Sequence, residues 1–344
     1  MTSTRPVIAV TLGDPAGIGP ELIARLFAES SLFADVHTVL VGDRWLWQEG
    51  QGVAGLSHQL PEVSDFAAAR HHAVPVFLPV DSVAEGEVGY AEETAAGGAS
   101  VLAILDRCLV AAQAGEVDAI CFAPLNKLAM KKGGLQHEDE LHFFAERLGV
   151  EGYFCEFNTL GSLWTSRISS HIPLKDAARY VTQDRIVAAS RLIHDSLKLA
   201  GFEAPRVAVA AFNPHAGEGG TCGREEIDVI APAVEACRAQ GYPIDGPFPA
   251  DTIFLKARDG DYDAIVTMYH DQGQIAIKLL GFKQGVTVQG GLPIPITTPA
   301  HGTAFDIAGR GKADVGPTRN AFEIACRMGA NLRCQRLADA ATHA

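Results

Sequence analysis

The sequence predicts an α/β protein with a mainly parallel, doubly wound sheet, and three observations support this class. Short β-branched apolar runs recur along the 344 residues. Stretches with apolar residues three and four positions apart lie between many of these runs, and strands that alternate with helices are typical of parallel sheets covered on both faces. Hydrophobic residues make up 47% of the chain, which is ample for a core and excludes a disordered chain.

The predicted strands and helices alternate along the whole chain. Strand-like runs lie at 7–12, 36–42, 74–79, 117–123, 153–157, 164–170, 206–212, 263–269 and 285–290. Helical patterns lie at 20–30, with Pro20 at its first position, at 91–116, 224–241 and 318–329, and "QGQIAIKLLG" (272–281) begins another helix. The chain is too long for one ordinary core, which favours two domains or one large unit. No Ser/Gly linker marks a boundary, so any division is discontinuous or passes through ordered structure.

The charge balance and the cysteines narrow the class of function. Lys and Arg number 28 against 41 Asp and Glu, a net charge of −13, which disfavours nucleic acid as a partner but leaves a small anionic substrate open. The seven cysteines form no C-x-x-C pair, so we expect buried small hydrophobes rather than a disulfide or zinc framework. The first residues contain no apolar signal core and nowhere do 18 apolar residues run together. We therefore expect a soluble cytoplasmic protein with no membrane partner.

A glycine-rich turn, "TLGDPAGIGPEL" (11–22), follows the first predicted strand. It is not a dinucleotide fingerprint, because Leu22 stands where G-x-G-x-x-G needs its third glycine and no acidic residue ends the second predicted strand. Two interpretations stay open. The segment is a tight strand-to-helix turn, or Asp14 and the glycine amides contact the substrate or cofactor.

Three histidines each follow an apolar strand-like run: His171, His215 and His270. Ligands bind at the carboxyl edge of open α/β sheets, so these side chains are candidates for one site. Neutral imidazoles suit a divalent ion such as Zn²⁺, Co²⁺, Ni²⁺ or Mn²⁺, and three protein ligands leave coordination positions open for catalysis. The alternatives are hydrogen-bonded core histidines and, for Asp271, a helix N-cap.

A second glycine-rich segment, "PAHGTAFDIAGRGKADVGP" (299–317), has few bulky apolar residues and contains Asp306. This composition indicates an ordered functional loop, and a long surface loop without function is the alternative.

The sequence resembles the 4-hydroxythreonine-4-phosphate dehydrogenase family nearly from end to end. The motifs that carry the resemblance are "GDPAGIGPE", "APLNK", "SSHIPL", "NPHAGEGG", "EEID", "GPFPADT", "MYHDQGQIAIK" and "HGTAFDIAGRGKADVG". The last segment is also similar to the adenosine-binding loop of isopropylmalate and isocitrate dehydrogenases. The resemblance implies two α/β/α domains with a cleft between them, as in those enzymes. We place one domain at 1–130 plus 286–344, with the adenosine loop, and the other at 131–285, with the metal ligands and dimer contacts.

The resemblance also implies the roles of individual residues. It implies a homodimer with a shared active site, in which His171, His215 and His270 hold one divalent metal (Zn, Mn, Mg or Co) and one of these histidines comes from the partner chain. Asp251 and Asp271 lie beside the metal, and Lys278 contacts a small-molecule substrate. The loop residues His301, Gly302, Thr303, Ala304 and Asp306 hold the adenosine of NAD or NADP. The implied reaction is oxidation of a secondary hydroxyl, with decarboxylation where the product is a β-keto acid.

The sequence departs from the family at the positions that bind phosphate. Glu140 and Leu141 stand where the family has His-Thr, Thr287 at a usual Asn position and Ile296 at a usual Arg position, while Lys278 is retained. A phosphate dianion needs charge-assisted donors, so we expect a non-phosphorylated hydroxy acid or diol acid, such as the cis-dihydrodiols of aromatic dicarboxylates. The acidic string "HEDELH" (137–142) either reshapes the pocket or is an acidic helix start favoured by the dipole.

Other functions stay open on the sequence alone. A true 4-phosphohydroxy-L-threonine dehydrogenase is the nearest alternative. A metal-dependent hydrolase is an alternative of another class, although it leaves the 299–317 loop without a role and the sequence has no H-E-x-x-H. A binding protein without turnover is the third.

Overall fold

The computed structural model describes residues 4–281 and 284–342, and the chain divides into two compact units. Unit 1 comprises Met1–Glu151 and Leu292–Ala344, and unit 2 comprises Gly152–Gly291. We predicted changes of domain at 130/131 and 285/286, and the contacts place them at 151/152 and 291/292. The reason is that α5 (Glu140–Arg147) packs on α3 (Ala95–Gln113) of unit 1, while β10 (Val286–Gly290) pairs with β5 (Cys155–Leu160) of unit 2.

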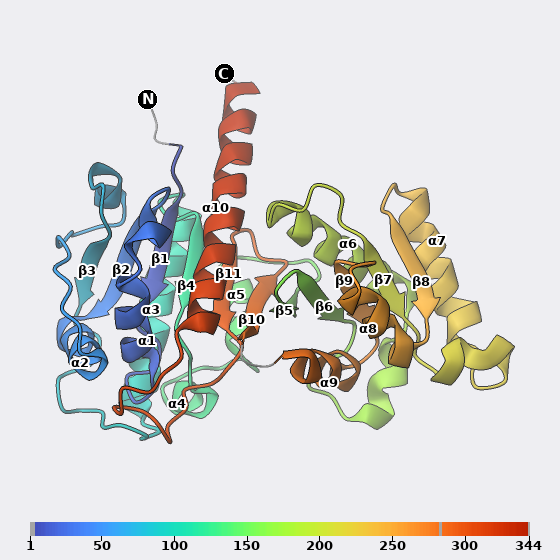
Figure 1. The fold of residues 1–344 in the computed structure, drawn as a ribbon, viewed down its shortest axis with the longest axis horizontal. Helices are drawn as coiled ribbons and strands as arrows, with labels where there is room; N and C mark the ends of the chain where they lie inside the picture. The colour runs from blue at the N-terminus through green and yellow to red at the C-terminus, as the bar shows by residue number, and fades with distance from the viewer. Residues whose placement is uncertain (1–3, 282–283, 343–344) are drawn as a thin grey trace. The chain divides into compact units, whose positions relative to one another are not determined.

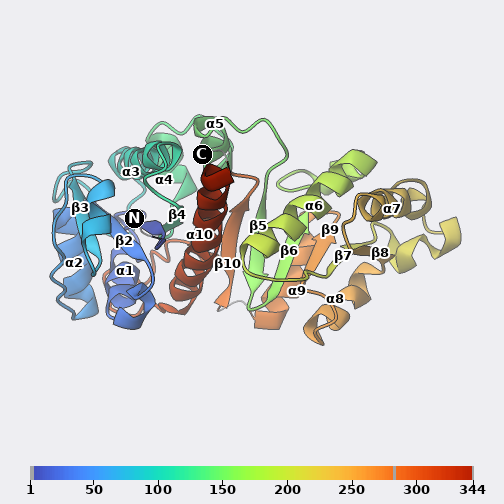
Figure 2. The same cartoon turned by 90° about the horizontal axis from the view of Figure 1, so that it is seen from above.

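Unit 1 is built on a parallel sheet with the strand order β3-β2-β1-β4-β11 (Figure 1). Its strands are β1 (Val7–Thr11), β2 (His37–Asp43), β3 (Val76–Val80), β4 (Ala119–Phe122) and β11 (Ile296–Pro299). Its other helices are α1 (Gly19–Phe27), α2 (Arg44–Ala54), α4 (Lys127–Lys132) and α10 (Gly316–Thr342). In Figure 2, α3, α4 and α5 cover one face of this sheet and α1, α2 and α10 the other. Helices on both faces explain why the strands of this unit are apolar throughout rather than alternating.

Helix α3 belongs to the core of unit 1. It is long and apolar enough to cross a membrane by composition, but 56% of its apolar window is buried within the described structure, as expected of a core helix. Val101, Ile104, Leu105 and Leu109 pack in one cluster with Val7 and other side chains of the sheet. A helix that is apolar on most sides is typical of such a buried position.

Unit 2 has a mixed sheet with the strand order β10-β5-β6-β9-β7-β8. Strand β5 is antiparallel to both neighbours, while β6, β9, β7 and β8 run parallel to one another. The remaining strands are β6 (Leu163–Arg167), β7 (Val207–Ala210), β8 (Ile244–Phe248) and β9 (Ala264–Thr267). The helices are α6 (Gln183–Leu199), α7 (Ala231–Ala239), α8 (Ala250–Arg258) and α9 (His270–Gly281). Helices α6 and α7 lie on one face, and α8 and α9 on the other (Figure 2).

The structure confirms every predicted strand and adds two. Strand β8 has Gly246 and Pro247 in its interior and β11 has only four residues, so neither has the long β-branched pattern that identified the others. Helix α10 continues to Thr342 rather than ending at 329. Strand β2 extends to Asp43, so an acidic residue does end the second strand, contrary to our expectation. Its carboxylate accepts hydrogen bonds from the backbone and hydroxyl of Ser82 and is engaged within the fold.

All seven cysteines are free. Cys108, Cys121 and Cys237 are buried, as expected of small hydrophobes, but Cys222 and Cys334 are exposed, so that expectation holds only in part.

Candidate active site

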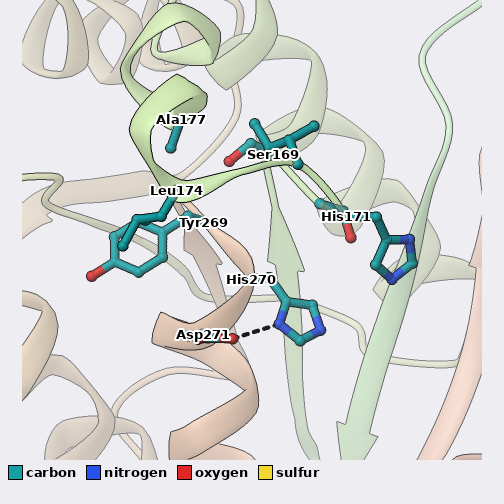
Figure 3. Close-up of a pocket in the computed structure, with 9 residues that line it drawn as sticks. Ser169, His171, Leu174, Ala177, Tyr269, His270 and Asp271 are labelled. Atoms are coloured by element: carbon teal, nitrogen blue, oxygen red, sulfur yellow. Dashed lines mark hydrogen bonds and ion pairs between the residues drawn. The ribbon is translucent and has the colours of Figure 1, made fainter.

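A cavity of about 160 Å³ opens in unit 2 at the carboxyl ends of β6 and β9 (Figure 3). Its lining comprises Ser169, Ser170, His171, Ile172, Leu174, Ala177, Tyr269, His270 and Asp271. The cavity lies where the sequence places the end of two strand-like runs. This is the edge at which open α/β sheets bind ligands.

The three predicted histidines follow three neighbouring parallel strands. His171 comes after β6, His270 after β9 and His215 after β7, and these strands are adjacent in the order β6-β9-β7. Parallel strands end at the same edge of a sheet, so the topology directs all three histidines to one edge of unit 2. The strand order therefore brings the three segments to one edge, and their binding of one metal ion stays a prediction.

His171 and His270 lie side by side in the cavity. Their ring centroids are 5.8 Å apart with an interplanar angle of 45°. Nδ1 of His270 is 2.7 Å from Oδ1 of Asp271, the contact drawn as a dashed line in Figure 3. An ionised carboxylate only accepts hydrogen bonds, so Nδ1 carries the proton and Nε2 of His270 keeps its lone pair. Helix α9 begins at His270, so Asp271 lies in its first turn and is not the N-cap.

Two of the three histidines have a left-handed backbone. His171 has φ 46° and His215 has φ 51°. Non-glycine residues are rare in this region, cost of order 1 kcal/mol or more there, and cluster at ligand sites. The strain at these two positions therefore favours a functional role over that of an ordinary hydrogen-bonded histidine.

A buried glutamate anchors the segment that carries His215. Residues 215–219 all have positive φ, a left-handed turn between Asn213 and Thr221. Oε1 of Glu226 accepts the backbone N–H of Phe212 at 2.8 Å and that of Asn213 at 2.7 Å, and Oε2 accepts Nδ2 of Asn213 at 2.9 Å. A Cβ on Gly217, which has φ 81°, would come within 2.7 Å of Oε2 of Glu226, so only glycine fits there. Glu226 lies in the motif "EEID", but no sequence pattern marks it as the group that positions the His215 turn.

The remaining candidates His215, Asp251 and Lys278 are not among the residues that line the cavity. His215 is exposed, and among the described residues no group of ligand atoms within 4.8 Å of one another contains all three histidines. Asp251 is exposed in the first turn of α8, and Lys278 is exposed two turns after Asp271 on α9. The donor set itself suits a divalent cation: two adjacent imidazoles, one of them oriented by a carboxylate, as in carboxylate–histidine–metal arrangements.

In unit 1 the two glycine-rich segments of the sequence lie against each other. The backbone N–H of Ile18 donates to the carbonyl of Thr303 at 3.1 Å, and a Cβ on Gly17 would come within 2.9 Å of Cβ of Thr303. Glu21 is buried and accepts from the backbone N–H of Ala313 at 2.9 Å, which fixes the far end of the predicted adenosine loop. His301 is half-buried, Gly302 and Asp306 are exposed, and Ala304 has φ 45°. An exposed carboxylate in a loop fixed at both ends suits the hydroxyl groups of an adenosine ribose.

Asp14 is almost fully buried in this part of unit 1. Its Oδ1 accepts the backbone N–H of Ala16 at 2.8 Å, and its Oδ2 has no hydrogen-bond partner among the described residues. Burial raises the pKa of Asp14 from 3.8 to about 6, although the backbone N–H groups of Ala16 and Asn126 oppose the rise.

The residues at the family's phosphate-binding positions are engaged inside the fold. Oε2 of Glu140 is 3.6 Å from Nζ of Lys127, Leu141 is buried, and Ile296 is part of the hydrophobic core of unit 1. Asp139 caps α5 by accepting the N–H of His142, so "HEDELH" is a capped helix start. In unit 2, Oγ1 of Thr287 accepts from Nδ2 of Asn158 at 3.2 Å. None of these four side chains provides a cationic donor for a phosphate.

A family model described as "Pyridoxal phosphate biosynthetic protein PdxA" matches residues 34–325 of the chain. The chain belongs to this family. It is 53% identical over 332 residues to the "Putative 4-hydroxythreonine-4-phosphate dehydrogenase 2" of Pseudomonas aeruginosa, covering 94% of this chain and 97% of that relative. A crystal structure of 4-hydroxythreonine-4-phosphate dehydrogenase from Klebsiella pneumoniae is 34% identical, with TM-score 0.83 and coverage of 96% and 99%. A terephthalate 1,2-cis-dihydrodiol dehydrogenase from Burkholderia xenovorans is 29% identical, with TM-score 0.67 and coverage of 92% and 98%.

The matches confirm the family resemblance read from the motifs. Proteins similar to this chain thus include ones named for phosphorylated and for non-phosphorylated substrates, on similar mixed α/β folds. Family membership therefore leaves the substrate to be argued from the residues of this chain.

Proposed function

We propose that the chain is an NAD-dependent, divalent-metal-dependent dehydrogenase that oxidises a secondary hydroxyl of a non-phosphorylated hydroxy acid or diol acid. The observation that carries the proposal is a pair of adjacent histidines, His171 with a strained backbone and His270 oriented by a carboxylate, at one sheet edge with His215. Membership of a family whose relatives bear dehydrogenase names supports the reaction class.

Each site residue has its own role in the proposed reaction. His171, His215 and His270 would hold the cation, and Asp271 keeps the proton on Nδ1 of His270 so that Nε2 faces the ligand. When bound there, a divalent cation supplies a Lewis acid that makes ionisation of a substrate hydroxyl accessible near neutral pH. Lys278 binds an anionic group of the substrate, and Asp271 or Lys278 takes the hydroxyl proton. Asp251, in the first turn of α8, is the carboxylate that the family resemblance would add beside the cation.

The loop from His301 to Asp306 would hold the adenosine of NAD or NADP, which accepts the hydride. Oxidation of a hydroxyl β to a carboxylate gives a β-keto acid, which loses carbon dioxide. The loop and its glycines support kinship with the isopropylmalate and isocitrate dehydrogenase architecture.

A homodimer with shared active sites is part of the proposal. In one chain His215 does not join the other two histidines within bonding distance of one ion, so a ligand from a second copy would complete the set. Helix α9, which begins at His270, exposes apolar side chains that a partner would cover: Ile275 is 58% exposed and Leu279 83%. We also propose a cytoplasmic location, since no disulfide joins the cysteines.

The substrate argument rests on charge. At the position where the family has His, Glu140 lies beside Lys127, so the pair has no net positive charge. At the position where the family has Arg, Ile296 lies in the hydrophobic core and has no charge. Loss of one charge-assisted contact to phosphate costs about 1.5–3 kcal/mol, or roughly 10- to 150-fold in affinity. The relative named terephthalate 1,2-cis-dihydrodiol dehydrogenase makes dihydrodiol carboxylates the first candidates. Relatives named D-threonate 4-phosphate dehydrogenases add a second phosphorylated compound to the alternatives.

The test is NADH formation on mixing the protein, Mn²⁺ or Zn²⁺, NAD and each candidate: a cis-dihydrodiol carboxylate, 4-phosphohydroxy-L-threonine and D-threonate 4-phosphate. We expect metal-dependent NADH from the dihydrodiol, with kcat/KM at least about tenfold above either phosphorylated compound. Higher efficiency with a phosphorylated compound would overturn the substrate class and leave the dehydrogenase intact. No NADH from any of them, together with hydrolysis of an ester probe, would favour the metal-dependent hydrolase.

A further inference from the structure

A polar face of the unit 2 sheet lies beneath α9 and beside the cavity. Strands β10, β5 and β6 are antiparallel neighbours, and their register aligns side chains in two rows. Thr287, Asn158 and Thr165 form one row. Gln289 and Glu156 face each other in the next, and Arg167 bonds Glu156 from β6. The packed face of a sheet is normally apolar, so a face of polar and charged side chains beneath a helix needs a reason.

Arg167 is the centre of this face. Its side chain is 5% exposed, and each of its three nitrogens donates to a different partner. Nη2 donates to Glu156 Oε2 at 2.8 Å, Nη1 to Asn158 Oδ1 at 2.7 Å, and Nε to Ser170 Oγ at 2.9 Å. Ser170 lines the cavity and precedes His171. One buried guanidinium therefore holds both the turn that presents a proposed metal ligand and the middle of β5.

The network continues from Asn158 to the substrate side. Nδ2 of Asn158 donates to Oγ1 of Thr287, and Gln274 of α9 donates to Oδ1 of Asn158. Gln274 and Thr287 are both half-buried, and Lys278 follows Gln274 one turn later on α9. The contacts thus run without a break from Ser170, at the histidine pair, to Thr287 and to Gln274, one turn before the lysine expected to bind substrate.

The polar face also has hydrogen-bonding capacity that the protein does not use. Gln289 is 2% exposed, and neither its amide nitrogen nor its amide oxygen has a partner among the described residues. It lies on the same face of β10 as Thr287, because side chains two residues apart on a strand share a face. Buried amide groups nearly always have a hydrogen-bond partner. The amide of Gln289, which lies opposite Glu156, therefore points to a partner that comes from outside the chain.

We propose that Arg167 is a positioning residue: through the face defined by Glu156, Asn158, Gln274, Thr287 and Gln289 it fixes the His171 turn relative to Thr287, which stands at a position where the family resemblance places substrate binding. Gln274, which shares Oδ1 of Asn158 with Arg167, is the added hydrogen-bonding residue for the end of the substrate remote from the reacting hydroxyl. The inference rests on the proposed function and adds two residues that the family resemblance does not assign. Glu156 balances the charge of Arg167, so the face contributes hydrogen bonds and no net charge, and Lys278 adds one cation. That combination fits a carboxylate or hydroxyl rather than a phosphate dianion.

The test separates positioning from support of the fold. Arg167→Met alone leaves Glu156 charged, largely buried and without its cation, and is expected to unfold easily, so the informative variant is the pair Arg167→Met and Glu156→Met. Replacing both members of a buried ion pair by apolar groups is often neutral for stability. We expect the double variant to keep its Tm within a few degrees, and KM for the best dihydrodiol or hydroxy acid to rise roughly tenfold or more, with a smaller change in kcat. Gln274→Leu, which changes one half-buried contact, is expected to raise the same KM roughly 3- to 10-fold.

Arg238 provides the matched control in unit 2. It also makes three bonds, to Glu235, Asp245 and the carbonyl of Ile244, but on α7 and β8, outside the cavity lining and the polar face. Arg238→Met should lower Tm without changing KM. If wild type turns over no compound, the proposed function fails. If wild type is active and both the double variant and Gln274→Leu retain its KM and its preference among substrates, the network is structural only and the inference is overturned.

Discussion

Replacement of Asp14 by asparagine should stabilise the protein in a pH-dependent way. Asp14 is 1% exposed, and burial raises its pKa from 3.8 to about 6. The folded state therefore holds the proton up to about pH 6, whereas the unfolded chain releases it near pH 3.8. Between these values the folded state binds more protons, so the free energy of unfolding falls as the pH rises, and the full penalty is present above pH 6. The asparagine variant would carry no such penalty, because an amide side chain does not ionise.

The size of the effect follows from the rise in pKa. The difference between 3.8 and about 6 corresponds to about 3 kcal/mol at pH 8, and to about 0.5 kcal/mol near pH 4. Asparagine keeps an oxygen that can accept from the N–H of Ala16. Its amide nitrogen would take the place of Oδ2, which has no partner among the described residues, so the gain is an upper estimate.

Urea unfolding at pH 8, 6 and 4.5 measures this prediction. We expect the free energy of unfolding of Asp14→Asn to be up to about 3 kcal/mol higher than that of the wild type at pH 8, and this difference to become smaller as the pH falls. Exposed Asp259 provides the control, since Asp259→Asn should change the free energy of unfolding by less than about 0.5 kcal/mol. An Asp14→Asn protein that is equally or less stable than wild type at every pH would refute the argument. If Asp14 also contacts substrate or cofactor, the stabilised variant should lose activity.

The remaining predictions concern the cation, the His215 turn and the cofactor loop. Asp271→Asn should weaken Zn²⁺ or Mn²⁺ binding about 10- to 100-fold in calorimetric titrations, because the proton on Nδ1 of His270 is no longer fixed by a carboxylate; unchanged affinity would contradict the assigned tautomer. Glu226→Gln should lower the free energy of unfolding, measured in urea, by about 2 kcal/mol, because a charged acceptor of three N–H groups is lost. The same variant should bind the metal ion more weakly. A variant that loses stability but keeps its metal affinity would show that Glu226 does not position the site. Gly309→Ala should raise the Kd for NAD, measured by fluorescence, while metal affinity stays constant, because φ is 72° and the new Cβ would lie 2.7 Å from the Tyr90 ring.

The fold could be predicted wherever hydrophobic periodicity is strong. Runs such as 7–12 and 263–269 contain fully buried parallel strands, and their continuous apolar pattern is the one that burial on both faces requires. Strands β8 and β11 were missed because proline, glycine or short length obscures the pattern, and tertiary pairing rather than propensity forms them. The domain boundaries were displaced for a similar reason: α5 belongs to unit 1 through packing on α3, which no local signal reveals.

The site could be predicted in part. Strand ends located His171 and His270 beside one another, since the sheet order that joins β6 to β9 makes neighbours of segments distant in the chain. The same reasoning could not place the side chain of His215, because its direction depends on the left-handed turn after Asn213. In the sequence, only the glycines of such a turn indicate its positive φ angles. Arg167 was also missed. An arginine inside a strand-like run has no distinctive pattern, and its role depends on partners on other strands and on α9.

Three features of this chain are expected to lower its stability. His171 and His215 have strained backbones, Asp14 is a buried carboxyl with one oxygen unbonded, and Gln289 is a buried amide without a partner among the described residues. A single substitution would relieve each of them: glycine at either histidine, asparagine at Asp14 and an apolar residue at Gln289. They are also not scattered, since they lie at the β6 and β7 edge, in the glycine-rich turn that contacts the 301–306 loop, and on the polar face beside Thr287. Local conflicts of this kind are expected where a structure is arranged around a ligand. Since each unit contains at least one of them, we expect ligand-induced stabilisation in both.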